Sequence, residues 1–180
     1  SLTTVTSFSS PGISYKGMDM TANGNRVVIV QPTNPRVQWS DTPFTTWNTV
    51  GFSGWGTAVA LSPDGNLLTF ADVGSNTVKY ATWNGTTYVV SGTSLSLPSV
   101  QANNMRFDST GTILFMFAIN NTHYYASWNS SSSSFSTVVA IPSTAIPNTS
   151  INPVASDVSD SSIIFGGYES KFSQTLLTFS

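Results

Sequence analysis

Residues 59–68 read VALSPDGNLL, and residues 80–85 read YATWNG. The first stretch places a Ser-Pro-Asp-Gly turn signal between two short apolar runs. Asp-Gly tolerates the positive φ of a tight hairpin turn, so two antiparallel strands are expected to meet at Gly65. The second stretch predicts another strand that ends at Trp83, followed by a turn at Asn84-Gly85.

The same features recur along the whole chain at a spacing of about 45 residues, the range typical of solenoids and propellers. Equivalent turns stand at Asn23-Gly24, Thr110-Gly111 and Asp160-Ser161-Ser162. Equivalent aromatic residues after the turns are Trp39, Trp83, Trp128 and Phe179, and a second aromatic set is Phe44, Tyr88 and Phe135. Apolar residues at a third recurring position are Ile13, Phe52, Val100 and Ile151. Because these three sets recur in register, we expect them to form the core between repeats.

Each copy predicts four antiparallel strands, which is the composition of a propeller blade. The fourth copy stops after its third strand, and residues 2–5 match the pattern of the missing one, residues 86–89. The sequence therefore predicts an all-β, four-bladed β-propeller whose ring is closed by the N-terminal strand. The predicted single domain covers residues 1–180. Its blades span about 12–50, about 51–98, about 99–149, and about 150–180 together with 1–8.

The line from Val59 to Gly85 resembles the blade repeats of FG-GAP-like and WD-type propellers, in which a similar Asp-Gly and Trp-Asn-Gly pattern is common. The resemblance is clearest over the second copy. It implies a propeller scaffold used for binding. The calcium loop of some FG-GAP blades is not matched, because Asp64 lacks the neighbouring aspartates of an Asp-x-Asp-x-Asp sequence.

Composition excludes several classes of function. Only 8% of the residues are charged, against about 25% in a typical protein, and the net charge is −2. A nucleic-acid partner would need a basic stripe, and membrane insertion would need an apolar run of about 18 residues; neither occurs. The chain has no cysteine, and we expect no cofactor. A surface rich in Ser, Thr and Asn favours an extracellular, virion-surface or cell-surface location.

Groups able to carry out catalysis are few. His123 is the single histidine, and beside two tyrosines it is expected to be a packing or surface residue. Asp19, Arg106 and Asp157 fall at near-equivalent positions of the innermost strands, which line the channel of a propeller. They could form a paired-carboxylate site for acid–base chemistry. The interpretation we favour is a structural ion cluster, in which the arginine holds the acids ionised.

Aromatic residues that do not recur are the better functional candidates. The second copy has two extra residues around Gly54-Trp55, in the loop that leads to its innermost strand. Exposed aromatic rings on a hydroxyl-rich surface can stack on sugar rings. The predicted ligand-binding residues are Trp55, Trp47, Tyr15, Ser14, Ser53, Gln101 and Asn152. The alternative is that the aromatic residues only plug the channel mouth.

These observations favour a non-catalytic surface recognition module that binds carbohydrate or serves adhesion through loops on one propeller face. Its partners would be a glycan or a surface protein. The first alternative is a structural subunit of a virion, fibre or cell-surface assembly, whose partners are copies of itself. The second alternative is a glycoside-processing enzyme that uses Asp19 and Asp157.

Overall fold

The computed structural model describes residues 16–31, 37–98, 102–118, 123–141, 153–159 and 162–167. Within these ranges every regular element is a β-strand, and neighbouring strands pair antiparallel. None of these residues forms a helix that could cross a membrane. The expected all-β antiparallel fold is confirmed.

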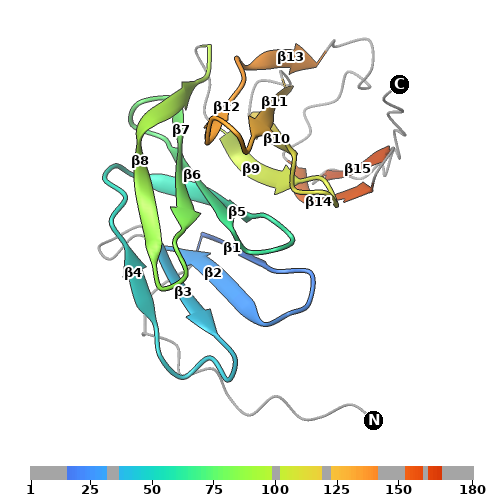
Figure 1. The fold of residues 1–180 in the computed structure, drawn as a ribbon. Coiled ribbons are helices and arrows are strands. Elements are labelled where there is room, and N and C mark those ends of the chain that lie inside the picture. The colour runs from blue at the N-terminus through green and yellow to red at the C-terminus, as the bar shows by residue number, and fades with distance from the viewer. Residues whose placement is uncertain are drawn as a thin grey trace.

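The strands form three large sheets and one strand pair (Figure 1). Sheet 1 contains β1 (Gly17–Met20), β2 (Arg26–Val30), β3 (Val37–Asp41) and β4 (Asn48–Val50). Sheet 2 contains β5 (Gly56–Leu61), β6 (Leu67–Asp72), β7 (Thr77–Trp83) and β8 (Tyr88–Ser96). Sheet 3 contains β9 (Ala102–Phe107), β10 (Ile113–Ala118) and β11 (His123–Asn129), with β12 (Ser134–Phe135) and β13 (Val139–Ile141) both paired to β11. Sheet 4 is the pair β14 (Pro153–Ser159) and β15 (Ser162–Gly167).

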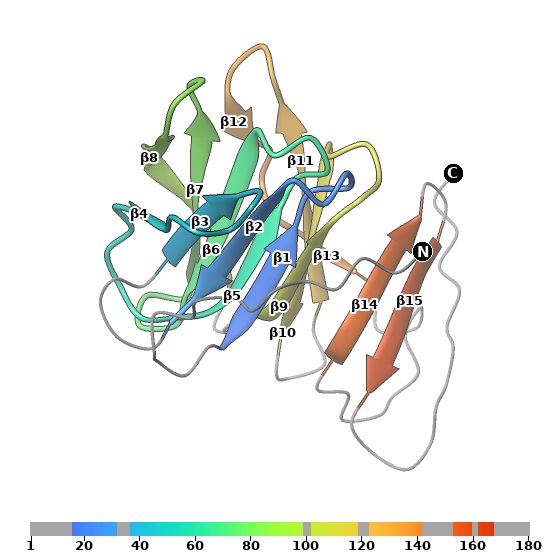
Figure 2. The same cartoon turned by 90° about the horizontal axis from the view of Figure 1, so that it is seen from below.

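The first strands of successive sheets lie side by side, β1 against β5, β5 against β9, and β9 against β14. Each sheet then extends outward from its first strand, as Figure 2 shows for sheets 1 to 3. Sheets arranged in this way are propeller blades. Ring closure through residues 1–8 stays a prediction, because those residues lie outside the described part of the chain.

Three hairpins at the inner end of the blades share one construction. Their glycines adopt positive φ angles of 71°, 76° and 73° at Gly24, Gly65 and Gly111. Each of these loops contains five residues. In each, the first residue accepts a hydrogen bond on its side-chain oxygen from the N–H five residues later. These bonds run from Arg26 to Thr21 (3.0 Å), from Leu67 to Ser62 (2.9 Å) and from Ile113 to Asp108 (2.8 Å).

Apolar side chains fill the space between adjacent blades. The cluster between sheets 1 and 2 includes Val28, Val30, Trp39, Phe52, Val59, Leu61, Leu68 and Phe70. The cluster between sheets 2 and 3 includes Leu67, Val78, Tyr80, Met105, Phe107, Leu114 and Met116, with Trp128 and Phe135 packed against it. Burial of one such side chain stabilises the fold by about 1.5–3 kcal/mol, so blade packing is the main source of stability.

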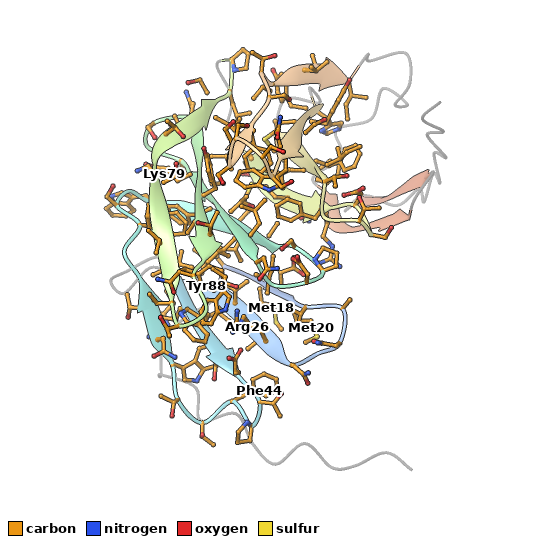
Figure 3. All side chains as sticks on the ribbon, in the orientation of Figure 1. Met18, Met20, Arg26, Phe44, Lys79 and Tyr88 are labelled. Carbon is orange, nitrogen blue, oxygen red and sulfur yellow. The ribbon has the colours of Figure 1, made fainter. Side chains whose placement is uncertain are left out.

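Arg26 closes the outer part of the interface between sheets 1 and 2 (Figure 3). Its guanidinium lies 3.7 Å from the centre of the Trp83 ring and 4.8 Å from that of Trp39. It also donates two hydrogen bonds to the Asp41 carboxylate, at 2.6 Å and 2.9 Å. Such stacking combined with a bidentate ion pair suits arginine and not lysine.

The recurring aromatic residues that the structure describes have structural roles, with one exception. Trp83 pairs across strands with Tyr88, and Trp128 with Phe135, as the repeat predicts. Phe44 breaks the pattern, because it lies in the β3–β4 loop with a φ of 62° and is not in a strand. The residue opposite Trp39 is Asn48. The β3–β4 loop is longer than its counterpart after Trp83, so counting five residues from the tryptophan gave the wrong partner.

Tyr88 gives this interface a pH dependence that can be measured. Its hydroxyl donates to the Gly65 carbonyl at 2.6 Å, and burial raises the pKa of Tyr88 to about 12. A tyrosine in the unfolded chain ionises near pH 10, so the stabilisation is complete below about pH 10 and is lost as the pH rises toward 12. We expect the free energy of unfolding to fall over this range by about 2–3 kcal/mol more in the wild type than in Tyr88→Phe. Urea denaturation at a series of pH values measures this difference, and parallel curves would contradict it.

Candidate functional site

Three of the predicted ligand-binding residues lie in the described part of the chain: Trp47, Ser53 and Trp55. The other four, Ser14, Tyr15, Gln101 and Asn152, lie outside it. The structure brings Ser53 and Trp55 together in the loop of residues 51–55, which leads into β5.

Trp47 does not belong to the same site as Trp55. It directly precedes β4, at the end of sheet 1 where Trp39 pairs with Asn48 and the β1–β2 hairpin lies. Trp55 directly precedes β5, at the opposite end, where Gly56 pairs with Asp72. The expected grouping of the two tryptophans is therefore wrong. The strand β4 lies between the two tryptophans in the chain and carries the backbone from one end of the sheet to the other. We call the Trp55 end the loop face and the other end the hairpin face.

Trp55 is the most exposed large apolar side chain among the described residues, with 65% of its surface accessible. The backbone N–H and carbonyl of Trp55 are nevertheless both hydrogen-bonded. The N–H donates to Asp72 Oδ1 at 3.0 Å, and the carbonyl accepts from the N–H of Val73 at 2.6 Å. The indole is therefore presented by a backbone that is already held in place.

Glycine is required at two positions beside Trp55. Gly54 has a φ of 111°, and a Cβ there would overlap the carboxylate of Asp72. A Cβ on Gly56 would overlap the ring of Phe70. A β-bulge between Gly56 and Val59 takes up one extra residue of this copy. The extra residues noted in the sequence thus form a loop that approaches the sheet closely.

Asp72 holds the loop together. Its Oδ1 also accepts from the N–H of Gly74 at 3.1 Å, and its Oδ2 accepts from Lys79 Nζ at 2.8 Å. Lys79 Nζ in turn donates to the carbonyl of Ser53 at 2.6 Å and to its Oγ at 3.1 Å. Burial alone would raise the pKa of Asp72, but the hydrogen bonds from Lys79 and from the Trp55 N–H bring the pKa below its usual value. The carboxylate is ionised and paired, so the site presents an aromatic ring and little net charge.

A second polar cluster lies where the innermost strands of three sheets meet. The Asp19 carboxylate on β1 accepts hydrogen bonds from the N–H groups of Leu61 and Met20, both at 2.9 Å, and forms an ion pair with Arg106 on β9. A cavity of about 240 Å³ opens beside it on the hairpin face. Asp157 lies on the neighbouring β14 opposite Ile164, and its side chain lies outside the described structure.

The protonation of Asp19 differs from the sequence-based expectation. Burial raises the pKa of the Asp19 carboxyl above its usual value, and Arg106 with the two backbone N–H groups lowers it only in part. Arg106 therefore does not hold this pKa low, because the acid is buried while much of the arginine side chain faces solvent. Both carboxylate oxygens already accept hydrogen bonds from the protein.

His123 has the packing role expected of it. It is buried on β11, its ring packs edge-on against Phe117 with centroids 5.6 Å apart, and burial lowers its pKa.

A groove that the sequence did not predict lies between the outer strands of sheets 2 and 3. It has a volume of about 530 Å³, and none of the described residues that line it is charged. Tyr80 and Phe135 form part of its wall, with Leu95, and hydroxyls from Thr93 and Ser134 border it. The hydroxyls of Tyr80 and Thr93 share a hydrogen bond of 2.5 Å. The signal that could have revealed this groove is the hydroxyl-rich sequence of both outer strands.

The geometry just described is that of a β-propeller. No protein-family model and no curated protein matches the sequence. Solved structures do match. A hydrazine synthase of Kuenenia stuttgartiensis aligns with 90% of this chain and 46% of its own, at 11% identity and a TM-score of 0.63. The WD40 repeats of RRP9 align with 89% of this chain and 47% of their own, at 12% identity and a TM-score of 0.62.

A third match is an auxiliary nutrient binding protein from Bacteroides thetaiotaomicron. It aligns over 73% of this chain and 32% of its own, at 11% identity and a TM-score of 0.57. The chain thus spans less than half the length of each of these structures. Since WD40 repeats are propeller blades, the matches confirm the resemblance to WD-type propellers as a likeness of fold.

We predict that Asp72→Ala loosens the Trp55 loop. The N–H groups of Trp55 and Gly74 lose the acceptor of their partly buried hydrogen bonds, and a typical hydrogen bond contributes about 0.5–1.5 kcal/mol. Amide hydrogen exchange at these two residues should accelerate strongly. Asp64→Ala is the matched control, because Asp64 builds a hairpin loop on the other face. Unchanged exchange at Trp55 in Asp72→Ala would show that the carboxylate does not hold the loop.

We predict that Arg106→Leu destabilises the protein more at pH 7 than at pH 4. Without Arg106, the pKa of the buried Asp19 carboxyl rises further, so the folded protein favours the protonated form of this carboxyl. A raised folded-state pKa gives stability that is present at low pH and is lost as the pH rises through that pKa. Urea denaturation at both pH values measures the effect. Asp19→Asn/Arg106→Leu should recover much of the loss at pH 7, and a pH-independent loss would contradict the assignment.

Proposed function

We propose that this chain is a non-catalytic recognition module that binds neutral carbohydrate through Trp55 and the loop of residues 51–55. One observation carries the proposal: an indole with 65% of its surface accessible stands on a backbone fixed by a buried carboxylate. A ring exposed to this extent adds little to the apolar surface that the fold buries. The ring is therefore best explained as a contact surface.

The surroundings of Trp55 favour a neutral ligand over a charged one. Asp72 and Lys79 neutralise each other, and Ser53 contributes a hydroxyl beside them. Sugar rings stack their C–H faces on an aromatic ring and use neutral hydrogen bonds. The uncharged groove at Tyr80 and Phe135 offers the same chemistry on the outer surface of the blades.

An extracellular or particle-surface location remains part of this proposal. It rests on the low charge content and on the abundance of hydroxyl side chains. Likeness of fold to a nutrient binding protein is compatible with it. Adhesion through many weak contacts would be the natural use of such a module.

Two alternatives remain. The structural-subunit alternative is favoured by the exposed side chains of Met18 and Met20 on β1. The enzyme alternative, with Asp19 and Asp157, has the raised pKa of Asp19 in its favour. It is weaker because the Asp19 oxygens are already bonded to Leu61, Met20 and Arg106.

The proposal is tested by titrating the protein with cellohexaose, xylohexaose, laminarihexaose and maltohexaose while following tryptophan fluorescence. We expect at least one sugar to bind with a Kd between about 1 μM and 1 mM. Trp55→Ala should weaken binding about tenfold or more, because stacking supplies much of such a small binding free energy. Affinity should be nearly equal at about 50 mM and about 500 mM salt, since few charges take part.

Trp47→Ala is the matched control, because it removes the same side chain from the opposite face. Equal binding by the wild type and Trp55→Ala, or no binding of any of the four sugars, would overturn the proposal.

A further inference from the structure

The groove between the outer edges of sheets 2 and 3 is open where the preceding blade interface is closed. Its walls come from β8 and β12, the last strands of their sheets, and from the chain that follows each of them (Figure 2). The outer strands of sheets 1 and 2, β4 and β8, instead lie against each other. The volume of about 530 Å³ is within the range of about 300–1,000 Å³ that is typical of small-molecule sites.

The floor of the groove is the outer end of the apolar cluster between the two sheets. The rings of Tyr80 and Phe135 meet edge to face there, with their centroids 5.2 Å apart, and Leu95 and Val138 lie beside them. Tyr80 and Leu95 are buried, whereas Phe135 and Val138 are only half-buried. A ligand seated on the floor therefore gains apolar contact by covering the latter two side chains.

Two hydroxyls of the rim are held in place by hydrogen bonds within the protein. The Thr93 hydroxyl shares a hydrogen bond of 2.5 Å with the hydroxyl of the buried Tyr80. The Oγ of Ser136 accepts from the N–H of Ser127 at 3.0 Å and donates to the carbonyl of Thr137 at 3.0 Å. The rim is thus a built surface in which the position of these oxygens is set before a ligand arrives.

Three further hydroxyls of the rim are available to a ligand. Ser94, Ser96 and Thr137 line the groove and are exposed, and their side chains make no hydrogen bond to another described residue. Each hydroxyl can donate one hydrogen bond and accept others. A rim of neutral hydroxyls above an apolar floor matches the two kinds of surface that a sugar ring presents, its hydroxyls and its C–H groups.

The same residues argue against a charged ligand and against a peptide strand. None of the described lining residues is charged, so a buried carboxylate or amine of a ligand would find no ion-pair partner. Residues 91–93 of β8 all lie opposite the single residue Tyr80. This β-bulge interrupts the free edge of β8, and a bulged edge resists the addition of another strand.

We propose that this groove is a second binding site for neutral glycan, separate from the Trp55 loop, so that one chain binds two glycan segments. The class of ligand rests on the function proposed above. The two sites lie on opposite sides of sheet 2. Tyr80 and Leu95 face sheet 3, whereas the neighbouring Lys79, which holds the Trp55 loop, points to the other side of the strand. Two weak sites on one chain give a higher avidity for a glycan polymer than either site alone.

Nuclear magnetic resonance titration of the ¹⁵N-labelled protein tests the proposal, because it reports on each site separately. The ligands are the four hexasaccharides named above, with hexagalacturonate as the charged comparison. Amides of residues 93–96 and 136–138 report on the groove, and those of residues 53–55 report on the loop. We expect one neutral sugar to shift both sets, each with a Kd between about 1 μM and 1 mM, and hexagalacturonate to leave the groove set unchanged.

The double variant Ser96→Ala/Thr137→Val should weaken binding at the groove about tenfold, because two hydrogen bonds are lost, and should leave the Kd at the loop unchanged. Thr87→Val/Ser130→Ala is the matched control. It removes the same two kinds of hydroxyl from exposed positions that line neither site, and both Kd values should stay as in the wild type. Trp55→Ala should weaken only the binding at the loop.

The outcomes separate the two proposals. Shifts confined to the loop set, or groove binding that is as strong in Ser96→Ala/Thr137→Val as in the wild type, would overturn the second site and leave the Trp55 site standing. Shifts confined to the groove set would support the second site and overturn the Trp55 site. No shift with any sugar would overturn both. Groove shifts with hexagalacturonate, or with an uncharged hexapeptide of alternating threonine and valine but no sugar, would overturn the assignment of the groove to neutral glycan.

Discussion

The described structure depends on the packing of sheets 1, 2 and 3 against one another through apolar side chains. The alternation along β5 shows the constraint directly: Val59 and Leu61 face sheet 1, whereas Ala58 and Ala60 face sheet 3. A single sheet of four strands could not bury both sets. The position of every loop, and therefore of every candidate site, follows from stacking the blades around their first strands.

Three of the six basic residues form ion pairs that hold parts of this structure together. Arg26 joins the hairpin ends of sheets 1 and 2, Arg106 joins sheet 3 to Asp19 of sheet 1, and Lys79 joins the Trp55 loop to sheet 2. Each pair includes a carboxylate that also receives backbone N–H groups or a second arginine nitrogen. These three ion pairs therefore fix the geometry of the parts that they join.

The sequence predicted what depends on local chemistry. The glycines of three hairpins adopt positive φ angles, and Trp83 and Trp128 pair with the aromatic residues expected. The exposure of Trp55 was also predicted, because Trp55 has no counterpart in the other copies of the repeat. Phe44 was misassigned because the β3–β4 loop is longer than its counterpart, which counting residues cannot detect. Trp47 was grouped with Trp55 because the sequence does not show that β4 separates them. Asp72 was missed since its partner Trp55 is 17 residues away, and only the pairing of Gly56 with Asp72 brings them together.

The direction in which the blades stack also decides where a ligand can reach the described part of the protein. Where sheets 1, 2 and 3 pack together, their sides are covered by one another. The loops at the two ends of these blades are left to meet a ligand, and Trp55 stands at one of these ends on a backbone held by Asp72. Because a neutral sugar contact contributes only a small binding free energy, occupancy at a surface depends on how many such contacts are presented together.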